Sequence, residues 1–211
     1  MANHTWNCNK VFVIGRNKTG TTSLAQVLVA MGYVLGDQAR AELLLDHWAR
    51  RDFHAIVDYC KQAEAFQDVP FSIDYTFQIV DYAFPGSKFI LSIRNSAQEW
   101  YDSLTRFHTL LLGKGRLPTP DDLKQFPYRY PGWLWKAQQL VYGIDESTLY
   151  DPDIYMQHYE AHNEKVLDYF KHRPDKLLVL NVAEPTALQR LSDFLQRPIP
   201  LSHMPHLNRS A

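Results

Sequence analysis

Residues 10–23 (KVFVIGRNKTGTTS) constrain the fold more than any other part of this chain. They begin with an apolar, β-branched run that ends in glycine, which predicts a buried parallel strand. A polar turn follows, and apolar residues then recur on one helical stripe (Leu24, Val27, Leu28 and Met31). A strand, a turn and an amphipathic helix in this order indicate the first βα unit of a parallel sheet.

Two further apolar runs, residues 88–93 (KFILSI) and 176–182 (KLLVLNV), are also predicted to be buried strands. Helical patterns lie between the strands, at residues 39–66 (in two pieces split near residues 50–52), 74–84, 97–112 and 152–172. This alternation predicts an α/β fold with three layers, a parallel sheet flanked by helices. The sequence contains no repeat and no linker, so we expect a single domain over residues 1–211.

The charge balance excludes some classes of partner. The formal net charge is −1, from 22 Lys and Arg against 23 Asp and Glu, which disfavours a globally basic nucleic-acid-binding protein but allows a local cationic pocket. The first ten residues (MANHTWNCNK) lack the apolar core of a signal peptide, and no apolar run approaches the ~18 residues of a membrane-spanning helix. We therefore expect a soluble cytoplasmic protein without a membrane span or a nucleic-acid partner.

The turn at residues 15–23 (GRNKTGTTS) has the composition of a phosphate-binding loop. The start of the following helix would offer N–H groups and the positive end of its dipole to an anion. Gly20 would let the backbone approach a ligand closely, and Lys18 would add a positive charge. Hydroxyl donors follow at Thr21, Thr22 and Ser23.

The two glycines of this turn have the G-x-x-x-x-G spacing of a nucleotide-triphosphate loop, but the motif is not completed. Thr21 stands where a nucleotide triphosphatase has its lysine, and the strand at residues 88–93 leads into Arg94 and Asn95 instead of a metal-binding aspartate. This pattern favours a phosphate site without a metal ion. A P-loop kinase or nucleotidase that requires Mg²⁺ and ATP is the enzymatic alternative, and a non-catalytic nucleotide-binding protein is another.

Two segments resemble the sulfotransferase family. Residues 17–24 (NKTGTTSL) look like its 5′-phosphosulfate-binding loop, and residues 84–104 (FPGSKFILSIRNSAQEWYDSL) look like its 3′-phosphate-binding strand and helix. Residues 176–200 are similar to the family's late strand and helix, and residues 205–208 (PHLN) are similar to the C-terminal end of many small members. The resemblance implies a P-loop NTPase-like topology for the α/β fold.

The resemblance also implies a reaction. The donor would be 3′-phosphoadenosine-5′-phosphosulfate, and its sulfuryl group would move to a hydroxyl or amine of a small-molecule or carbohydrate acceptor, without a metal ion. By motif position, Lys18 would contact the phosphosulfate and Arg94 the 3′-phosphate. The expected donor-binding residues are Arg16, Asn17, Lys18, Thr19, Gly20, Thr21, Thr22, Ser23, Arg94, Ser103 and Arg209.

Two serines are candidates for the residue that binds the 3′-phosphate. Ser103 lies nine residues after Arg94, where the family usually has eight, and one extra helical residue would turn the side chain by roughly 100°. Either the turn at residues 95–97 absorbs the insertion and Ser103 is the ligand, or Ser96 takes its place. We favour Ser103.

The general base is expected just before the helix at residues 74–84. Asp68, in Asp-Val-Pro, occupies the place of a His-Leu-Pro found in cytosolic relatives, and it is the first candidate. Asp74 is the second candidate, although it could instead cap the helix that follows. His108, at the end of the 3′-phosphate helix, is the third. We expect no metal at residues 158–162 (HYEAH), because no Glu follows the first His directly.

Residues 113–133 differ from the rest, because glycine and proline recur there and aromatic residues lie among basic ones. We expect little regular structure in this stretch, and we interpret residues 106–136 as a lid or acceptor-binding segment. The wider segment holds six Lys or Arg against two Asp, together with several aromatic residues. Such a surface could bind an aromatic or carbohydrate acceptor, cover the donor, or form a homodimer contact.

Overall fold

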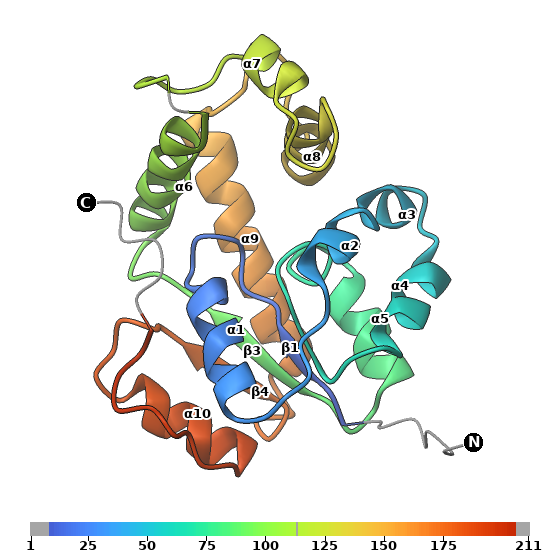
Figure 1. The fold of residues 1–211 in the computed structure, drawn as a ribbon, viewed down its shortest axis with the longest axis vertical. Coiled ribbons are helices and arrows are strands. Elements are labelled where there is room, and N and C mark those ends of the chain that lie inside the picture. Colours follow the sequence, from blue (N-terminus) through green and yellow to red (C-terminus); the bar gives the residue numbers. More distant parts are fainter. Residues whose placement is uncertain (1–8, 113, 206–211) are drawn as a thin grey trace. The chain divides into compact units, whose positions relative to one another are not determined.

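The computed structural model describes residues 9–112 and 114–205. These residues form two compact units: residues 9–93 with 166–205 make up the first, and residues 94–112 with 114–165 make up the second. The second unit is therefore inserted between two strands of the first (Figure 1). Arg209 and most of the C-terminal PHLN segment lie outside the described residues.

A four-stranded parallel sheet lies at the centre of the first unit. Its strands are β1 (Val11–Val13), β2 (Ala65–Gln67), β3 (Lys88–Ser92) and β4 (Leu177–Leu180), in the order β2-β1-β3-β4. The residue Phe12 of β1 is in register with Phe66 of β2 and Phe89 of β3. The α/β class, the parallel sheet and the strands predicted at residues 10–15, 88–93 and 176–182 are confirmed.

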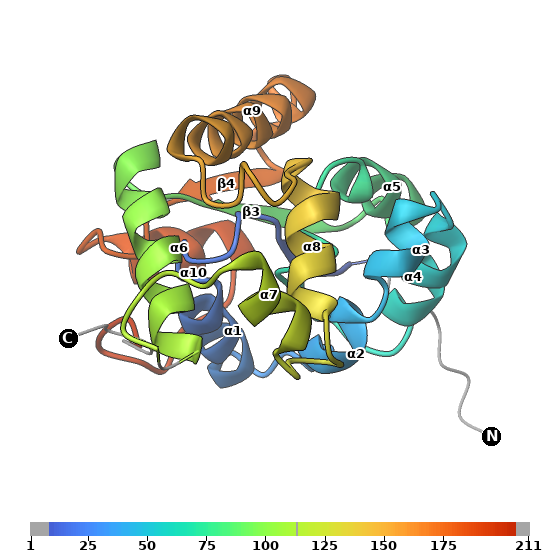
Figure 2. The ribbon, with the colours of Figure 1, turned by 90° about the horizontal axis from the view of Figure 1, so that it is seen from above.

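Alternation along the strands assigns different residues to the two faces of the sheet. Val11, Val13 and Ile90 face one side, where they join a buried aliphatic core. That side is covered by α1 (Thr21–Ala30) and α10 (Ala187–Leu195), which lie on the same side of the sheet in Figure 1 and Figure 2. The apolar stripe predicted for α1 thus packs against the sheet, as its helical spacing requires.

The other face of the sheet is aromatic. The ring of Phe12 stacks on Phe66 at 5.3 Å and on Phe89 at 5.5 Å between centroids. Phe170, in the last turn of α9 (Pro152–Phe170), lies 4.8 Å from Phe89. Phe77 of α5 (Thr76–Ala83) completes the layer at 6.2 Å from Phe170. Helices on both faces make the three layers expected from the sequence.

The chain between α1 and β2 contains three short helices, α2 (Gln38–Glu42), α3 (Leu45–Ala49) and α4 (Phe53–Cys60). The predicted break near residues 50–52 is confirmed. The prediction of helix to residue 66 is wrong, because residues 65–67 form β2 and pair with β1. A strand of three residues is too short for its alternation to be recognised, so only the pairing with β1 identifies it.

Asp74 does not cap α5. The N-cap residue is Tyr75, which has a φ of 69° and makes no side-chain capping bond. The carboxylate of Asp74 lies instead beside Arg16, with 4.0 Å between Oδ1 and Nη2. Local sequence rules assign this side chain to the helix end, but in the fold it lies beside the buried guanidinium.

The second unit is helical. It contains α6 (Ala97–Leu112), α7 (Pro120–Gln125), α8 (Trp133–Tyr142) and most of α9. The expectation of little regular structure over residues 113–133 is wrong for α7, which has Pro120 in its first turn and a capping box between Thr119 and Asp122. Reciprocal hydrogen bonds of this kind stabilise even a short helix in a glycine- and proline-rich stretch.

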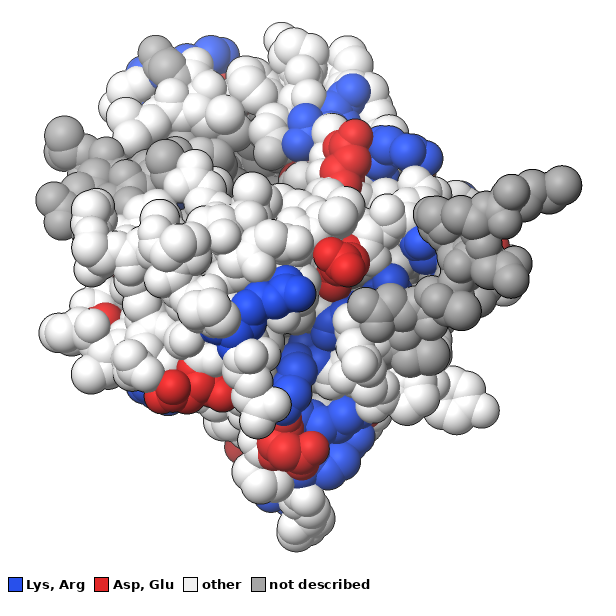
Figure 3. Space-filling model, turned by 60° about the horizontal axis from the view of Figure 1, so that its bottom comes forward, with Lys and Arg blue, Asp and Glu red and all other residues white. Residues whose placement is uncertain are grey.

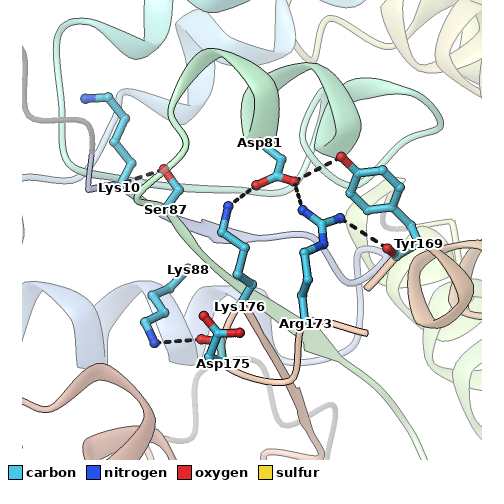
Figure 4. A network of polar contacts seen from close by, with 8 residues as sticks. All are labelled: Lys10, Asp81, Ser87, Lys88, Tyr169, Arg173, Asp175 and Lys176. Carbon is cyan, nitrogen blue, oxygen red and sulfur yellow. Dashed lines mark hydrogen bonds and ion pairs between the residues drawn. The ribbon is translucent and has the colours of Figure 1, made fainter. Parts of the chain in front are cut away.

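A buried carboxylate connects three elements of the first unit (Figure 4). Asp81 of α5 is 5% exposed and accepts hydrogen bonds from Lys176, Arg173 and the hydroxyl of Tyr169, the last at 2.9 Å. Burial by itself would raise the pKa of Asp81, but the hydrogen bonds from Lys176, Arg173 and Tyr169 outweigh it and hold the pKa below its ordinary value. This network ties α5 to the end of α9 and the start of β4.

We expect Asp81→Asn to lower the free energy of unfolding by about 2–4 kcal/mol at neutral pH, because it leaves two cations without their buried counter-charge. The exposed Asp168, which pairs with Lys171 at 2.9 Å, provides the control: Asp168→Asn should change stability by less than about 0.5 kcal/mol. Urea unfolding measures both variants.

The pH dependence supplies a second test of Asp81. A carboxylate with a depressed folded pKa stabilises the protein above its unfolded pKa of ~3.9, and this contribution is lost as the pH falls through the folded pKa. The difference between wild type and Asp81→Asn should therefore shrink below about pH 4. Equal stability of the two proteins at pH 7 would contradict the assigned role.

Candidate functional site

The loop between β1 and α1 contains two residues with left-handed backbone conformations. Lys18 and Gly20 both adopt left-handed conformations, with φ values of 67° and 94°. Gly20 is the N-cap residue of α1 and provides no side-chain capping bond to the first turn of the helix. The N-cap residue thus supplies no side chain to the positive end of α1, and the half-buried side chain of Lys18 lies in the same loop; both features suit an anion.

Packing requires glycine at both ends of this loop. A Cβ atom at Gly15 would lie 2.2 Å from the backbone oxygen of Ser92, and one at Gly20 would lie 2.4 Å from a methyl group of Val182. The G-x-x-x-x-G spacing thus lets the loop sit directly against the end of β3 and the segment after β4. Packing is therefore a reason for glycine at position 20 that does not depend on the ligand contact predicted from the sequence.

The hydroxyl residues of this segment lie in two places: Thr19 is in the loop, and Thr21, Thr22 and Ser23 are in the first turn of α1. Thr19 is fully buried, and its Oγ1 hydrogen bonds to the carbonyl of Arg16 and to Oγ of Ser92, each at 2.6 Å. Thr19 therefore holds the loop together. Thr21 and Ser23 in the first turn of α1 are buried, whereas Thr22 is exposed.

Two carboxylates lie beside the cations of the loop. Arg16 is 2% exposed and faces Asp74 at 4.0 Å. The charges of Lys18 and Arg16 both act on Asp68, which follows the last residue of β2. The first unit thus brings together four residues that the sequence analysis singled out: Arg16, Lys18, Asp68 and Asp74.

Asp68 is held in a tight turn at the carboxyl end of β2. Its φ is 57°, and its carbonyl accepts hydrogen bonds from the N–H groups of Phe71 and Ser72 at 2.7 and 3.0 Å. Its Oδ1 accepts a hydrogen bond from the N–H of Val69 at 2.9 Å. Burial raises the pKa of Asp68 above its ordinary value, opposed by the Val69 N–H, by the charges of Lys18 and Arg16, and by Ser72. A carboxylate in this setting is a stronger base than an exposed one.

The sequence analysis missed the side chains that hold the backbone at Val69 and Asp74. Nε2 of Gln38 in α2 donates to the carbonyl of Val69 at 3.1 Å, next to Asp68. Nε1 of Trp48 in α3 donates to the carbonyl of Asp74 at 2.7 Å. Arg51 lies over the rings of Trp48 and Tyr75, 4.9 and 4.5 Å from their centroids. No sequence signal distinguishes these residues from ordinary helix-surface residues, because the contacts are long-range.

Arg94, Ser96, Ser103 and His108 belong to the second unit. Arg94 follows Ile93, whose N–H still bonds to the carbonyl of Leu180 in β4. The N–H of Arg94 donates to the hydroxyl of Tyr159 at 2.9 Å, and Nη1 of Arg94 lies 3.5 Å from Oε1 of Glu99. The start of α6 is therefore held by α9.

The two candidate serines have different surroundings. Ser96 is exposed, and its Oγ accepts a hydrogen bond from the N–H of Glu99 at 3.1 Å, which is the bond of an N-cap residue. Ser103 lies half-buried, two turns into α6. Ser96 is thus placed at the start of α6, and Ser103 on the body of the helix.

His108 is an interior residue of the second unit. It is 3% exposed, and its Nδ1 and the hydroxyl of Tyr150 are hydrogen bonded at 2.7 Å. Burial raises the pKa of the Tyr150 hydroxyl, so this group keeps its proton at neutral pH. These contacts make His108 a weaker candidate for the base than Asp68.

The described residues contain no group of His, Cys, Asp and Glu side chains with the arrangement of a metal site. Among the same residues, no helix is long and apolar enough to cross a membrane. On the face drawn in Figure 3, Lys and Arg side chains form a band that is interrupted and bordered by Asp and Glu. This mixture of signs agrees with the formal net charge of −1.

Comparison with known proteins identifies the family. A search of the curated proteins finds no match to this chain. A family model described as a sulfotransferase domain matches residues 10–211. The match extends over the phosphate loop, the turn with Asp68, and Arg94 with the helix that follows it. The chain therefore belongs to the sulfotransferase family.

Proposed function

We propose that this protein transfers a sulfuryl group from 3′-phosphoadenosine-5′-phosphosulfate to a hydroxyl or amine of a small-molecule or carbohydrate acceptor. The observation that carries this proposal is the loop between β1 and α1, where the charge of Lys18 acts on the carboxylate of Asp68 and where the N-cap Gly20 gives α1 no side-chain capping bond. An anion site next to a partly buried carboxylate suits a reaction in which a proton leaves a nucleophile while negative charge develops on a phosphate.

The proposed roles follow from this arrangement. The acceptor oxygen or nitrogen attacks the sulfur atom, and the bond from sulfur to the bridging phosphate oxygen breaks. Asp68 takes the proton that the acceptor loses. Lys18 and the N-terminus of α1 stabilise the charge on the departing phosphate, which is released as 3′-phosphoadenosine-5′-phosphate. No metal ion is needed for these steps.

The position of Arg94 supports a second phosphate contact. Its backbone is fixed through Tyr159, whose ring stacks on the buried Trp100 at 4.8 Å between centroids. We propose that the guanidinium binds the 3′-phosphate and that Ser103 assists. This contact would distinguish the sulfuryl donor from nucleotides that lack a 3′-phosphate.

Calorimetry tests the donor assignment directly. We expect 3′-phosphoadenosine-5′-phosphate to bind more tightly than 5′-AMP or ATP, and its affinity to be unchanged by EDTA. Binding of ATP that is tighter than that of the bisphosphate, and that depends on Mg²⁺, would contradict the proposal and identify a kinase or nucleotidase.

Arg94→Ala should weaken binding of 3′-phosphoadenosine-5′-phosphate by about 10- to 100-fold, since a charge-assisted hydrogen bond contributes ~1.5–3 kcal/mol. Its effect on 5′-AMP should stay within about twofold, because that nucleotide has no group for Arg94 to bind. The exposed Arg50 provides a control, since Arg50→Ala removes the same charge from a distant part of the chain. Equal weakening of both nucleotides would make Arg94 a structural residue.

A further inference from the structure

A carboxylate is fixed next to Arg94 by residues other than Arg94. Oε2 of Glu99 accepts two hydrogen bonds from Asn95, one from its backbone N–H at 3.2 Å and one from Nδ2 at 2.7 Å. The N–H of Glu99 donates to Oγ of Ser96 at 3.1 Å. Glu99 also lies in the first turn of α6, where the helix dipole favours a negative charge. These contacts hold the carboxylate in place without the participation of Arg94.

The contact between Glu99 and Arg94 is longer than a strong hydrogen bond. Oε1 of Glu99 lies 3.5 Å from Nη1 of Arg94, beyond the usual 2.7–3.2 Å range for a nitrogen donor. This contact therefore orients the guanidinium only weakly. The negative charge of Glu99 nevertheless repels any anion that approaches Arg94, although solvent and salt screen this repulsion because the side chain is 40% exposed.

We propose that Glu99 is a fixed counter-charge that weakens the binding of the 3′-phosphate at Arg94, so that the bisphosphate product dissociates faster than it otherwise would. This inference rests on the proposed function, because it assigns the 3′-phosphate to Arg94. Both the donor and the product carry this phosphate, with about two negative charges at neutral pH, so Glu99 repels both. As a result, the product leaves the site sooner and the site becomes free for the next donor molecule.

The test is the affinity of Glu99→Gln for 3′-phosphoadenosine-5′-phosphate, measured by calorimetry at low salt. The amide keeps the shape of the side chain and an oxygen that can accept the bonds from Asn95. We expect binding to tighten by roughly three- to tenfold, since one unit charge near a phosphate at the surface is removed. The affinity for 5′-AMP should not change.

Two further measurements separate charge from structure. Asp102→Asn removes a negative charge from an exposed position of the same helix, where the side chain bonds to Gln98 at 2.8 Å, and it should change the affinity by less than about twofold. The gain from Glu99→Gln should also largely disappear in about 1 M salt, where the screening length is ~3 Å. Glu99→Ala, which removes the same charge, should tighten binding as well.

The outcomes distinguish this inference from the proposed function. A wild-type protein that binds the bisphosphate no better than 5′-AMP would overturn both. A wild-type preference for the bisphosphate, with unchanged or weaker binding in Glu99→Gln and Glu99→Ala, would overturn only the role of Glu99 and make it a residue that positions Arg94. Damage to the fold cannot imitate the expected result, because that result is a gain in affinity confined to one nucleotide.

Discussion

Asp68→Asn is expected to lower turnover by roughly 10²–10⁴-fold, because it removes the proton acceptor while keeping the shape of the side chain. Asparagine also tolerates the left-handed backbone at this position, where φ is 57°. The affinity for 3′-phosphoadenosine-5′-phosphate should remain within about threefold of wild type, since the carboxylate does not bind the nucleotide in this mechanism. Release of the bisphosphate from the phosphosulfate donor, with the best acceptor from a panel of phenols, alcohols and amines, measures turnover.

The raised pKa of Asp68 predicts how both turnover and stability should change with pH. Turnover should fall as the pH drops through this pKa, because only the ionised carboxylate accepts a proton. A carboxyl group whose pKa is raised on folding stabilises the protein when protonated, and that contribution is lost as the pH rises through the folded pKa. Asp68→Asn should therefore raise the melting temperature at neutral pH while it lowers activity.

Asp74 is the matched comparison for Asp68. Asp74→Asn removes a carboxylate from the same cluster, but it leaves the buried Arg16 without its counter-charge, so we expect lower stability together with a smaller loss of turnover. If Asp68→Asn keeps more than about a tenth of wild-type turnover while Asp74→Asn loses it, then Asp74 is the base. Retention of turnover by both variants would direct the search to His108.

Lys18→Ala is expected to lower turnover by roughly 10²–10³-fold, the effect typical of removing one group that stabilises developing charge in a transition state. Its effect on the affinity for the bisphosphate should be smaller than its effect on turnover, because the extra charge on the leaving phosphate exists mainly in the transition state. Single-turnover kinetics and calorimetry on the same preparation measure the two quantities.

The left-handed backbone of Lys18 requires a control for strain. Lys18→Gly also removes the ammonium group but suits the φ of 67° better than alanine does. If loss of the charge is responsible, both variants should lose turnover to a similar extent. Recovery of activity in the glycine variant, or a loss of affinity with turnover intact, would show that Lys18 is not needed in the transition state.

Much of the fold could be predicted because its signals are local. The apolar runs that became β1, β3 and β4 are each bounded by turn residues, and α1 and α6 show clear helical spacing. The loop between β1 and α1 was recognisable for the same reason, since its glycines, lysine and hydroxyl residues lie close together in the chain. The element that was missed, β2, has three residues and no pattern of its own.

The sequence by itself therefore determined the α/β class, the loop with Lys18 and the position of Arg94 after its strand. The tertiary structure decided which polar groups meet. It turned Thr19 towards Ser92, placed Asp74 beside Arg16 instead of at the start of α5, and brought Asp68 under the influence of Lys18 and Arg16. The physical reason is that burial and pairing of charges depend on contacts between distant segments, which no local pattern records.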